Sequence, residues 1–201
     1  MDRRDVTVWM PANVIVAERD DALMACLAAR DAQALRTVVS LYGEKAHRIA
    51  WRMLGDAGEA EDVAQEAMLK LWEQAGGWSA GGQGIGPWLA RVTANLCIDR
   101  MRRIRPMTGV ELPERTDETP LADAQFDEGR VRELTQAALQ SLPDRQRAAI
   151  VLTYWEECSN QQAAEALEMN IKAFESLLLR ARKALREELE LLGLAGPEEA
   201  A

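Results

Sequence analysis

The side chains of this sequence that could do chemistry are charged groups, and they are unevenly distributed along the chain. Residues 86–105 hold five arginines against one acid, Asp99, and residues 172–186 hold five basic residues against Glu175, so each segment carries +4. Between them, residues 111–129 hold seven acids and one arginine, which gives −6. Two basic islands of this kind favour contact with a polyanion such as a nucleic acid, although the whole chain carries −9.

The same inventory argues against catalysis. His47 is the only histidine, and Cys26, Cys97 and Cys158 stand far apart, so the close ligand pairs of a zinc site cannot be assembled. No nucleophile is paired with a base, and no phosphate-binding loop is present. We therefore expect no enzyme, no metal and no cofactor, and we interpret the cysteines as small buried residues of a reducing compartment.

A membrane location is not expected either. No apolar run approaches the roughly 18 residues that a span requires. The apolar stretch 6–17 is interrupted by Pro11 and Asn13, and no cleavage site of small residues follows it. We expect a cytoplasmic protein without membrane insertion.

Helices must position the charged groups, because alanine, leucine, glutamate and arginine dominate and β-branched runs are short. We predict an all-α fold: two small helical domains, 22–105 and 131–192, joined by a flexible acidic linker, 106–130. The predicted helices of the first domain are 22–29, 32–41, 44–54, 59–74 and 87–103. Pro87 is expected as the first residue of the last of these helices, and Pro106 is expected to end it.

Residues 76–86 predict a flexible loop, because six glycines in eleven residues oppose a helix. In the helix before it, Glu59, Asp62 and Glu66 form an acidic stripe beside Leu69, which suits a basic helical protein partner. In the helix after it, the Asn95 side chain can form hydrogen bonds with base edges, and the arginines can bind phosphates. Asp99 is four residues from Arg103 and could instead pair with it. Trp88 is interpreted as a core residue rather than a base-stacking platform.

The second island predicts a helix-turn-helix. Ser159 and Gln162 fit a capping box, and Asn170 fits the cap of a second helix from Ile171 to about Leu191. That helix would present basic and hydroxyl groups to a DNA major groove. An ordinary helical hairpin with a solvated charged face is the alternative. The outward residues are Lys172, Glu175, Ser176, Leu179, Arg180 and Lys183.

Several stretches together resemble the extracytoplasmic-function (ECF) sigma factors of RNA polymerase. They are 56–66 with 69–72, 87–95 with 99–103, the segment Leu142-Pro143-Asp144-Arg145-Gln146-Arg147, and 180–186. Glu168, Glu175 and Leu177 depart from that family's commonest pattern, Glu168 standing where a turn glycine is usual. The upstream sequence preference therefore cannot be inherited from relatives.

The resemblance implies a sigma factor that binds core RNA polymerase and directs promoter-specific initiation, held inactive by an anti-sigma factor. Its partners would be the clamp helices and flap of the polymerase, and promoter DNA as single strand and as duplex. The first domain would bind polymerase, melt the promoter and recognise its minus-ten element, and the second would recognise the minus-thirty-five element. The acidic linker would lie in the polymerase's RNA-exit path.

The resemblance also implies a role for each candidate residue. The loop 76–86 would accept a base flipped from the non-template strand. The polymerase-binding residues would be Glu59, Asp62, Gln65, Glu66 and Leu69. The downstream element would be bound by Trp78, Gln83, Arg91, Asn95, Asp99, Arg102 and Arg103, and the upstream element by the six outward residues of the helix-turn-helix. Two alternatives remain: a sigma mimic that sequesters an anti-sigma factor without binding DNA, and a repressor with one helix-turn-helix, which leaves the helix 56–72 unexplained.

Overall fold

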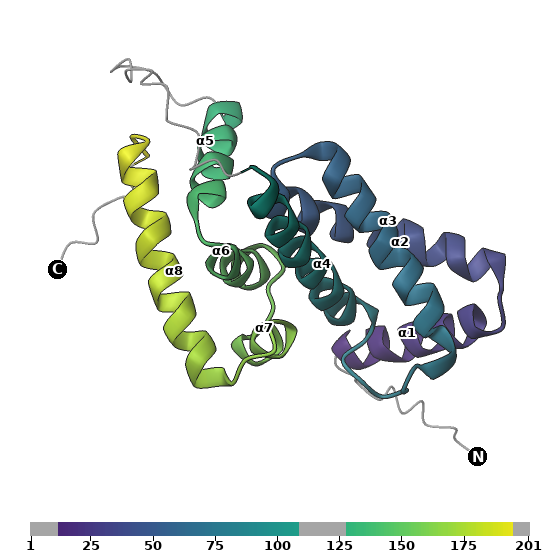
Figure 1. The fold of residues 1–201 in the computed structure, drawn as a ribbon. Helices are drawn as coiled ribbons and strands as arrows, with labels where there is room; N and C mark the ends of the chain where they lie inside the picture. Colours follow the sequence, from purple (N-terminus) through teal and green to yellow (C-terminus); the bar gives the residue numbers. More distant parts are fainter. Residues whose placement is uncertain (1–11, 109–127, 195–201) are drawn as a thin grey trace.

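A computed structural model describes residues 12–108 and 128–194, and all regular structure within these ranges is helical (Figure 1). The predicted all-α class is therefore confirmed. The predicted linker lies mostly outside the described residues. The helices before this gap are α1 (Ala12–Ala28), α2 (Ala32–Leu54), α3 (Ala57–Gln74), a 3₁₀ turn (Ala75–Gly77) and α4 (Ile85–Thr108). The helices after it are α5 (Glu128–Ser141), α6 (Asp144–Ile150), a π-helical turn (Val151–Trp155), α7 (Asn160–Ala166) and α8 (Ile171–Leu191).

Several predicted helix boundaries were wrong. The predicted helices 32–41 and 44–54 form the single helix α2, which runs through Gly43, because burial of its apolar face outweighs the roughly 1 kcal/mol that an interior glycine costs. Helix α4 begins at Ile85, so Pro87 is its third residue, where a helix needs no backbone N–H donor. Pro106 lies within α4, whose last turn continues to Thr108.

Capping fixes the start of the long helices. Asp31 accepts a hydrogen bond from the Gln33 amide at 2.7 Å before α2, and Asp56 accepts one from the Glu59 amide at 2.8 Å before α3. Gly55 ends α2 with a left-handed backbone at φ 72°. Gly55 and Asp56 together reverse the chain between α2 and α3, which lie side by side (Figure 1).

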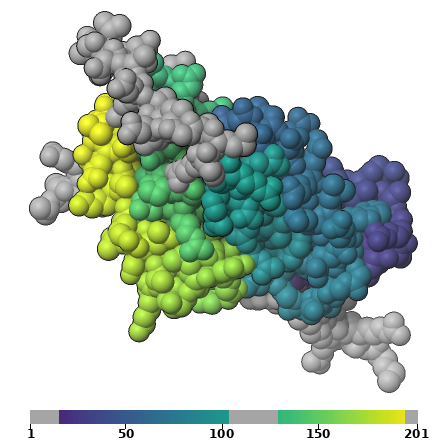
Figure 2. Space-filling view, viewed as in Figure 1, coloured from purple at the N-terminus to yellow at the C-terminus, as the bar shows by residue number. Residues whose placement is uncertain are grey.

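Helix α4 stands between the two helical domains and belongs to two apolar clusters. One cluster packs α1–α3 and the start of α4, and includes Leu27, Leu71 and Leu89. The other joins α2, α3 and the rest of α4 to α5–α8, and includes Met53, Cys97 and Phe174 among others. The two domains thus share one core, because helices α6 and α7 pack against α4. In Figure 2 the green surface of the second domain lies beside the teal surface of α4.

Buried polar groups hold the domains together. Arg147 of α6 is 5% exposed and donates to the carbonyl of Met53 at the end of α2, and to the carbonyl of Gln140 at 2.6 Å. Glu156 has a fully buried side chain between Lys45 (3.0 Å) and Arg48 (3.2 Å) of α2. Burial of such groups is tolerated because each has partners.

Candidate functional sites

The acidic stripe of α3 gathers around one arginine. Arg100 of α4 lies 2.7 Å from Glu59, 4.0 Å from Asp62 and 3.7 Å from Glu66, measured between nitrogen and carboxylate oxygen. Arg100 was counted in the basic island, but a pairing role was not predicted for it. The three acids retain considerable exposure, so a basic partner would share them with Arg100 or displace it.

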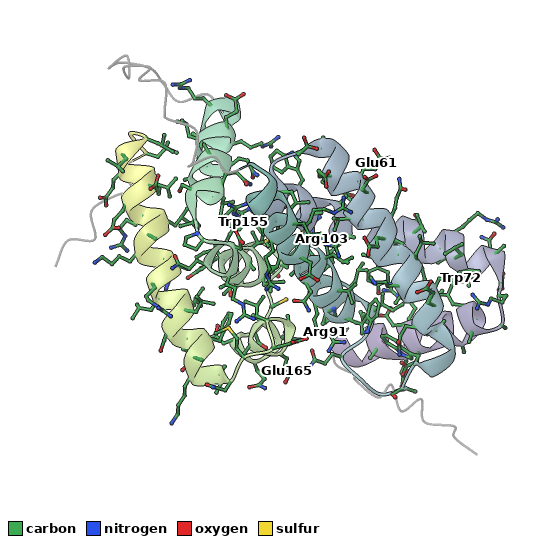
Figure 3. All side chains as sticks on the ribbon, in the orientation of Figure 1. Glu61, Trp72, Arg91, Arg103, Trp155 and Glu165 are labelled. Carbon is green, nitrogen blue, oxygen red and sulfur yellow. The ribbon has the colours of Figure 1, made fainter. Side chains whose placement is uncertain are left out.

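An apolar residue completes this surface. Leu69 is 63% exposed, and Gln65 is exposed and donates to Glu61 at 3.4 Å. Glu61 also projects outward from α3 in Figure 3. An exposed leucine beside half-exposed acids is the combination of an apolar anchor with a charged rim that protein interfaces use. We call Glu59, Asp62, Gln65, Glu66 and Leu69 the α3 surface.

The glycine-rich loop is anchored to α1 rather than left as a free connection. Asp21 accepts hydrogen bonds from the indole N–H of Trp78 and from the Gly81 amide, both at 2.8 Å. The bond from Trp78, and to a lesser extent the bond from Gly81, hold the pKa of the Asp21 carboxyl below its usual value. The loop was predicted to be flexible, and these two hydrogen bonds restrict its movement at Trp78 and Gly81.

A second aspartate fixes the end of the loop. Asp20 is fully buried and accepts from the Ile85 amide at 2.8 Å and from the Tyr42 hydroxyl at 2.5 Å. Burial of the Tyr42 hydroxyl, together with its hydrogen bond to the charged Asp20 carboxylate, raises the pKa of Tyr42 to about 12. Gly84 has φ +84°, and a Cβ there would lie 2.8 Å from an Asp20 carboxylate oxygen, so only glycine fits.

The loop and the start of α4 line a cavity of about 310 Å³. Trp78 and Trp88 are half-buried and meet edge to face, with ring centroids 6.4 Å apart. Trp88 packs against the apolar cluster of α1–α3, as predicted for a core residue. Across the cavity, Gln83 donates to Glu165 of α7 at 2.9 Å, a contact that the sequence did not predict. Trp78 and the side-chain amide of Gln83 give this cavity stacking and hydrogen-bonding capacity.

The remaining α4 candidates form an open face. Arg91, Asp99, Arg102 and Arg103 are exposed and Asn95 is half-buried; Figure 3 labels Arg91 and Arg103 near opposite ends of the helix. Asp99 lies 3.7 Å from Arg102, three residues on, and this pair replaces the predicted one with Arg103. Arg103 therefore keeps its charge available on this face.

The second basic island is a helix-turn-helix, as predicted. The capping box is complete: Ser159 accepts from the Gln162 amide at 3.2 Å, and the Gln162 side chain accepts from the Ser159 amide at 2.9 Å. Asn170 caps α8 by accepting from the Ala173 amide at 2.9 Å. In the turn between them, Glu168 has φ 53°, the conformation that a glycine would adopt without strain.

Helix α8 divides its residues between a buried and an exposed side. Phe174, Leu177, Leu178 and Ala181 are buried, so Leu177 packs in the core. Leu179 is 62% exposed, so its side chain is available to a partner. All six predicted contact residues are exposed: Lys172, Glu175, Ser176, Leu179, Arg180 and Lys183.

The three cysteines differ in burial. Burial raises the pKa of the Cys97 thiol to about 12 and also raises that of Cys158, whereas Cys26 is exposed. In the two ranges that the structure describes, no group of three His, Cys, Asp or Glu side chains could hold a metal ion. Within the same ranges no helix is long and apolar enough to cross a bilayer.

Three features of these surfaces were missed by sequence reasoning: Arg100, the aspartate pair Asp20–Asp21, and Glu165. The i, i+3, i+7 spacing of Glu59, Asp62 and Glu66 shows that one cation could serve all three acids, and this was a usable signal. No local pattern connects Asp21 to a tryptophan 57 residues away.

Comparison with known proteins agrees with this architecture. The family model "Sigma-70 region 2" matches residues 38–106, and "Sigma-70, region 4" matches residues 132–185. The chain is 31% identical over 171 residues to the ECF RNA polymerase sigma factor SigW of Bacillus subtilis, covering 79% of this chain and 90% of that protein. It is 31% identical over 156 residues to SigE of Mycolicibacterium smegmatis, covering 76% of this chain and 60% of that protein.

Solved structures resemble it in fold. CnrH in complex with the cytosolic domain of CnrY superposes with a TM-score of 0.63 at 23% identity, over 86% of this chain and 97% of that chain. RpoE in complex with the anti-sigma factor NepR from Bartonella quintana superposes with a TM-score of 0.61 at 23% identity. The match covers 78% of this chain and 96% of that chain. The matched regions and relatives show that this chain belongs to the ECF family of RNA polymerase sigma factors, with sigma-70 regions 2 and 4.

Proposed function

We propose that this sigma factor binds core RNA polymerase through the α3 surface and positions it on promoters by two DNA contacts. The observation that carries this proposal is the exposure of all six predicted contact residues on one side of α8, in a capped helix-turn-helix. A second helix with exposed arginine, lysine and serine side chains has the groups that read major-groove edges.

The polymerase contact rests on charge and an apolar anchor. The three acids around Arg100 would attract a basic helical surface. We propose that this surface is the clamp helices of the polymerase, and that the flap contacts the second domain. Leu69→Ala should weaken binding to core polymerase about tenfold, because the interface would lose the apolar area that the leucine side chain buries. Leu191→Ala is a matched control, since Leu191 is 65% exposed at the far end of α8. Equal affinities for the two variants would contradict the assignment.

The two proposed DNA contacts bind different forms of DNA, one single-stranded and one duplex. The open α4 face and the loop residues Trp78 and Gln83 take the melted non-template strand of the minus-ten element, with one base extruded into the cavity of about 310 Å³. Arg91, Asn95, Asp99, Arg102 and Arg103 supply phosphate and base-edge contacts. Helix α8 takes the minus-thirty-five duplex.

An anti-sigma factor is the third proposed partner. The solved structures that this chain resembles include RpoE in complex with the anti-sigma factor NepR. Such a partner would cover the surfaces that polymerase and DNA use. We infer that the protein acts in the cytoplasm, where its polymerase and promoters are.

Transcription reconstituted with core polymerase over a promoter library tests function and reads sequence preference together. Arg180→Ala should relax the upstream preference at a cost of roughly 1–3 kcal/mol if the guanidinium contacts a base. Arg36→Ala removes the same charge from an exposed residue of α2 and should leave that preference unchanged. Unchanged preference in Arg180→Ala would refute its role. No promoter-specific initiation, with tight binding of a co-purifying anti-sigma protein, would instead identify a sigma mimic.

A further inference from the structure

A cavity of about 600 Å³ lies between α2, α5 and the π-helical turn Val151–Trp155. None of its lining residues is among those proposed to contact polymerase or DNA, so the proposed function gives it no role. Its volume lies within the range of about 300–1,000 Å³ that small-ligand sites occupy. We propose that this cavity binds a nucleoside polyphosphate, with the phosphates on Arg52 and Arg132 and the base stacked on Trp51.

Positive charge gathers at this cavity. Arg48 and Arg52 lie one helical turn apart on α2, and Arg132 lies near the start of α5. Glu156 partly neutralises Arg48 and Lys45, to which it is bonded at 3.2 and 3.0 Å. Within the described ranges, no carboxylate forms an ion pair with Arg52 or Arg132. The cavity therefore carries an excess of positive charge, which attracts an anion.

Arg52 has hydrogen-bonding capacity that its own fold does not use. Its Nη1 atom is shielded from water and has no hydrogen-bond partner among the described residues. Burial, and then the charge of Arg48, lower the pKa of Arg52. Arg132 adds to this lowering, while Glu156 opposes it. A phosphate group would supply an acceptor and reduce the repulsion between the arginines, since guanidinium groups bind phosphate oxygens bidentately.

Aromatic side chains line the same cavity. Trp51 and Trp155 are both half-buried there, and Figure 3 labels Trp155 where the second domain meets the first. The Arg52 guanidinium lies over the Trp155 ring, 5.3 Å from its centroid, so Trp51 is the ring on which a base would stack. Glu44 is the acid among the described lining residues, and its exposed carboxylate can accept hydrogen bonds from ribose hydroxyls. Phosphate, base and sugar each find matching chemistry.

Hydrogen bonds from α5 fix the walls of the cavity. Gln136 donates to the carbonyls of Trp51 at 3.1 Å and Arg52 at 3.3 Å. Gln140 donates to the Arg52 carbonyl at 3.0 Å. These bonds hold α5 against the end of α2, so Arg132 on one helix and Arg52 on the other face the same cavity. A ligand that contacts both arginines therefore binds a preformed site, which lowers the entropic cost of binding.

Isothermal titration calorimetry of the full-length protein with ATP tests the proposal. Pyrophosphate should bind about tenfold more weakly than ATP because it has no base to stack, and adenosine about a hundredfold more weakly because it has no charge. Arg132→Gln should weaken ATP binding about tenfold through the loss of one charge-assisted contact. Arg130→Gln is the matched control. It makes the same charge change two residues earlier on α5, outside the cavity lining, and should change the affinity by less than twofold.

Hydrogen exchange locates the bound nucleotide. ATP should slow the exchange of amides in α5 and at the end of α2, and should leave those of α8 unchanged. Slower exchange in α8 alone, or equal losses of affinity in Arg132→Gln and Arg130→Gln, would overturn the proposal, since ATP would then bind a basic surface as any polyanion does. Absence of ATP binding, adenosine binding as tightly as ATP, or pyrophosphate binding as tightly as ATP would also overturn it. Reconstituted transcription tests the promoter contacts separately from each of these measurements.

Discussion

Replacing Glu156 by glutamine measures how much one buried carboxylate contributes to joining the two domains. Its side chain is fully buried, 3.0 Å from the Lys45 ammonium and bonded twice to the Arg48 guanidinium at 3.2 Å. Hydrogen bonds to charged groups contribute about 1.5–3 kcal/mol each. The Arg48 side chain is 39% exposed, so its share is reduced by solvent screening. Glutamine keeps one acceptor, and we expect a loss of about 2 kcal/mol in the free energy of unfolding.

Thermal and urea denaturation of the full chain provide the assay. A loss of about 2 kcal/mol corresponds to a fall of roughly 4–8 °C in Tm for a chain of this size. Glu157→Gln is the matched control: it makes the same charge change at the next, exposed residue, and should stay within about 0.5 kcal/mol. A double-mutant cycle with Lys45→Met should give a coupling of about 1 kcal/mol. If Glu156→Gln lowers Tm no more than Glu157→Gln, the buried ion pair does not hold the domains together.

Three further predictions concern single residues. Glu168→Gly should raise stability by about 0.5–1 kcal/mol in urea denaturation, because glycine removes the left-handed strain at φ 53°; a loss of stability would contradict this. Gly84→Ala should cost about 2–4 kcal/mol, whereas Gly81→Ala, with a similar φ but open space, should cost about 1; equal losses would show that the close approach to Asp20 does not matter. The folded pKa of Asp21 is lowered, so its contribution to stability is complete above the ordinary value of 3.8 and disappears as pH falls through the folded pKa. The stability difference between the unaltered chain and Asp21→Asn should therefore shrink below about pH 4, and a constant difference would refute the anchoring role.

The helical fold and the helix-turn-helix could be predicted because their signals are local. Ser159 and Gln162 form the capping box that their spacing indicates, and Asn170 caps α8. Apolar periodicity placed Phe174 and Leu178 on the buried side of α8. Glycine and proline were less reliable guides: Gly43 and Pro106 lie within helices, because packing of a long apolar face can outweigh a local preference.

The arrangement of the candidate sites was harder to predict because it depends on distant contacts. Charge patterning identified the acids of α3, but their common partner Arg100 follows Glu59 by 41 residues. The glycine-rich loop was correctly identified as a loop, yet its two anchors lie on α1, whose residues had been assigned no role. A pattern of residue types indicates which face of a helix is apolar or charged, but not which other element covers that face.

The same distinction explains why the contact between α7 and the glycine-rich loop is invisible in the sequence. Glu165 reads as an exposed acid on a short helix, and Gln83 as a polar residue in a loop 82 positions earlier. Their contact exists only because α4 packs against both domains and brings α7 over the loop.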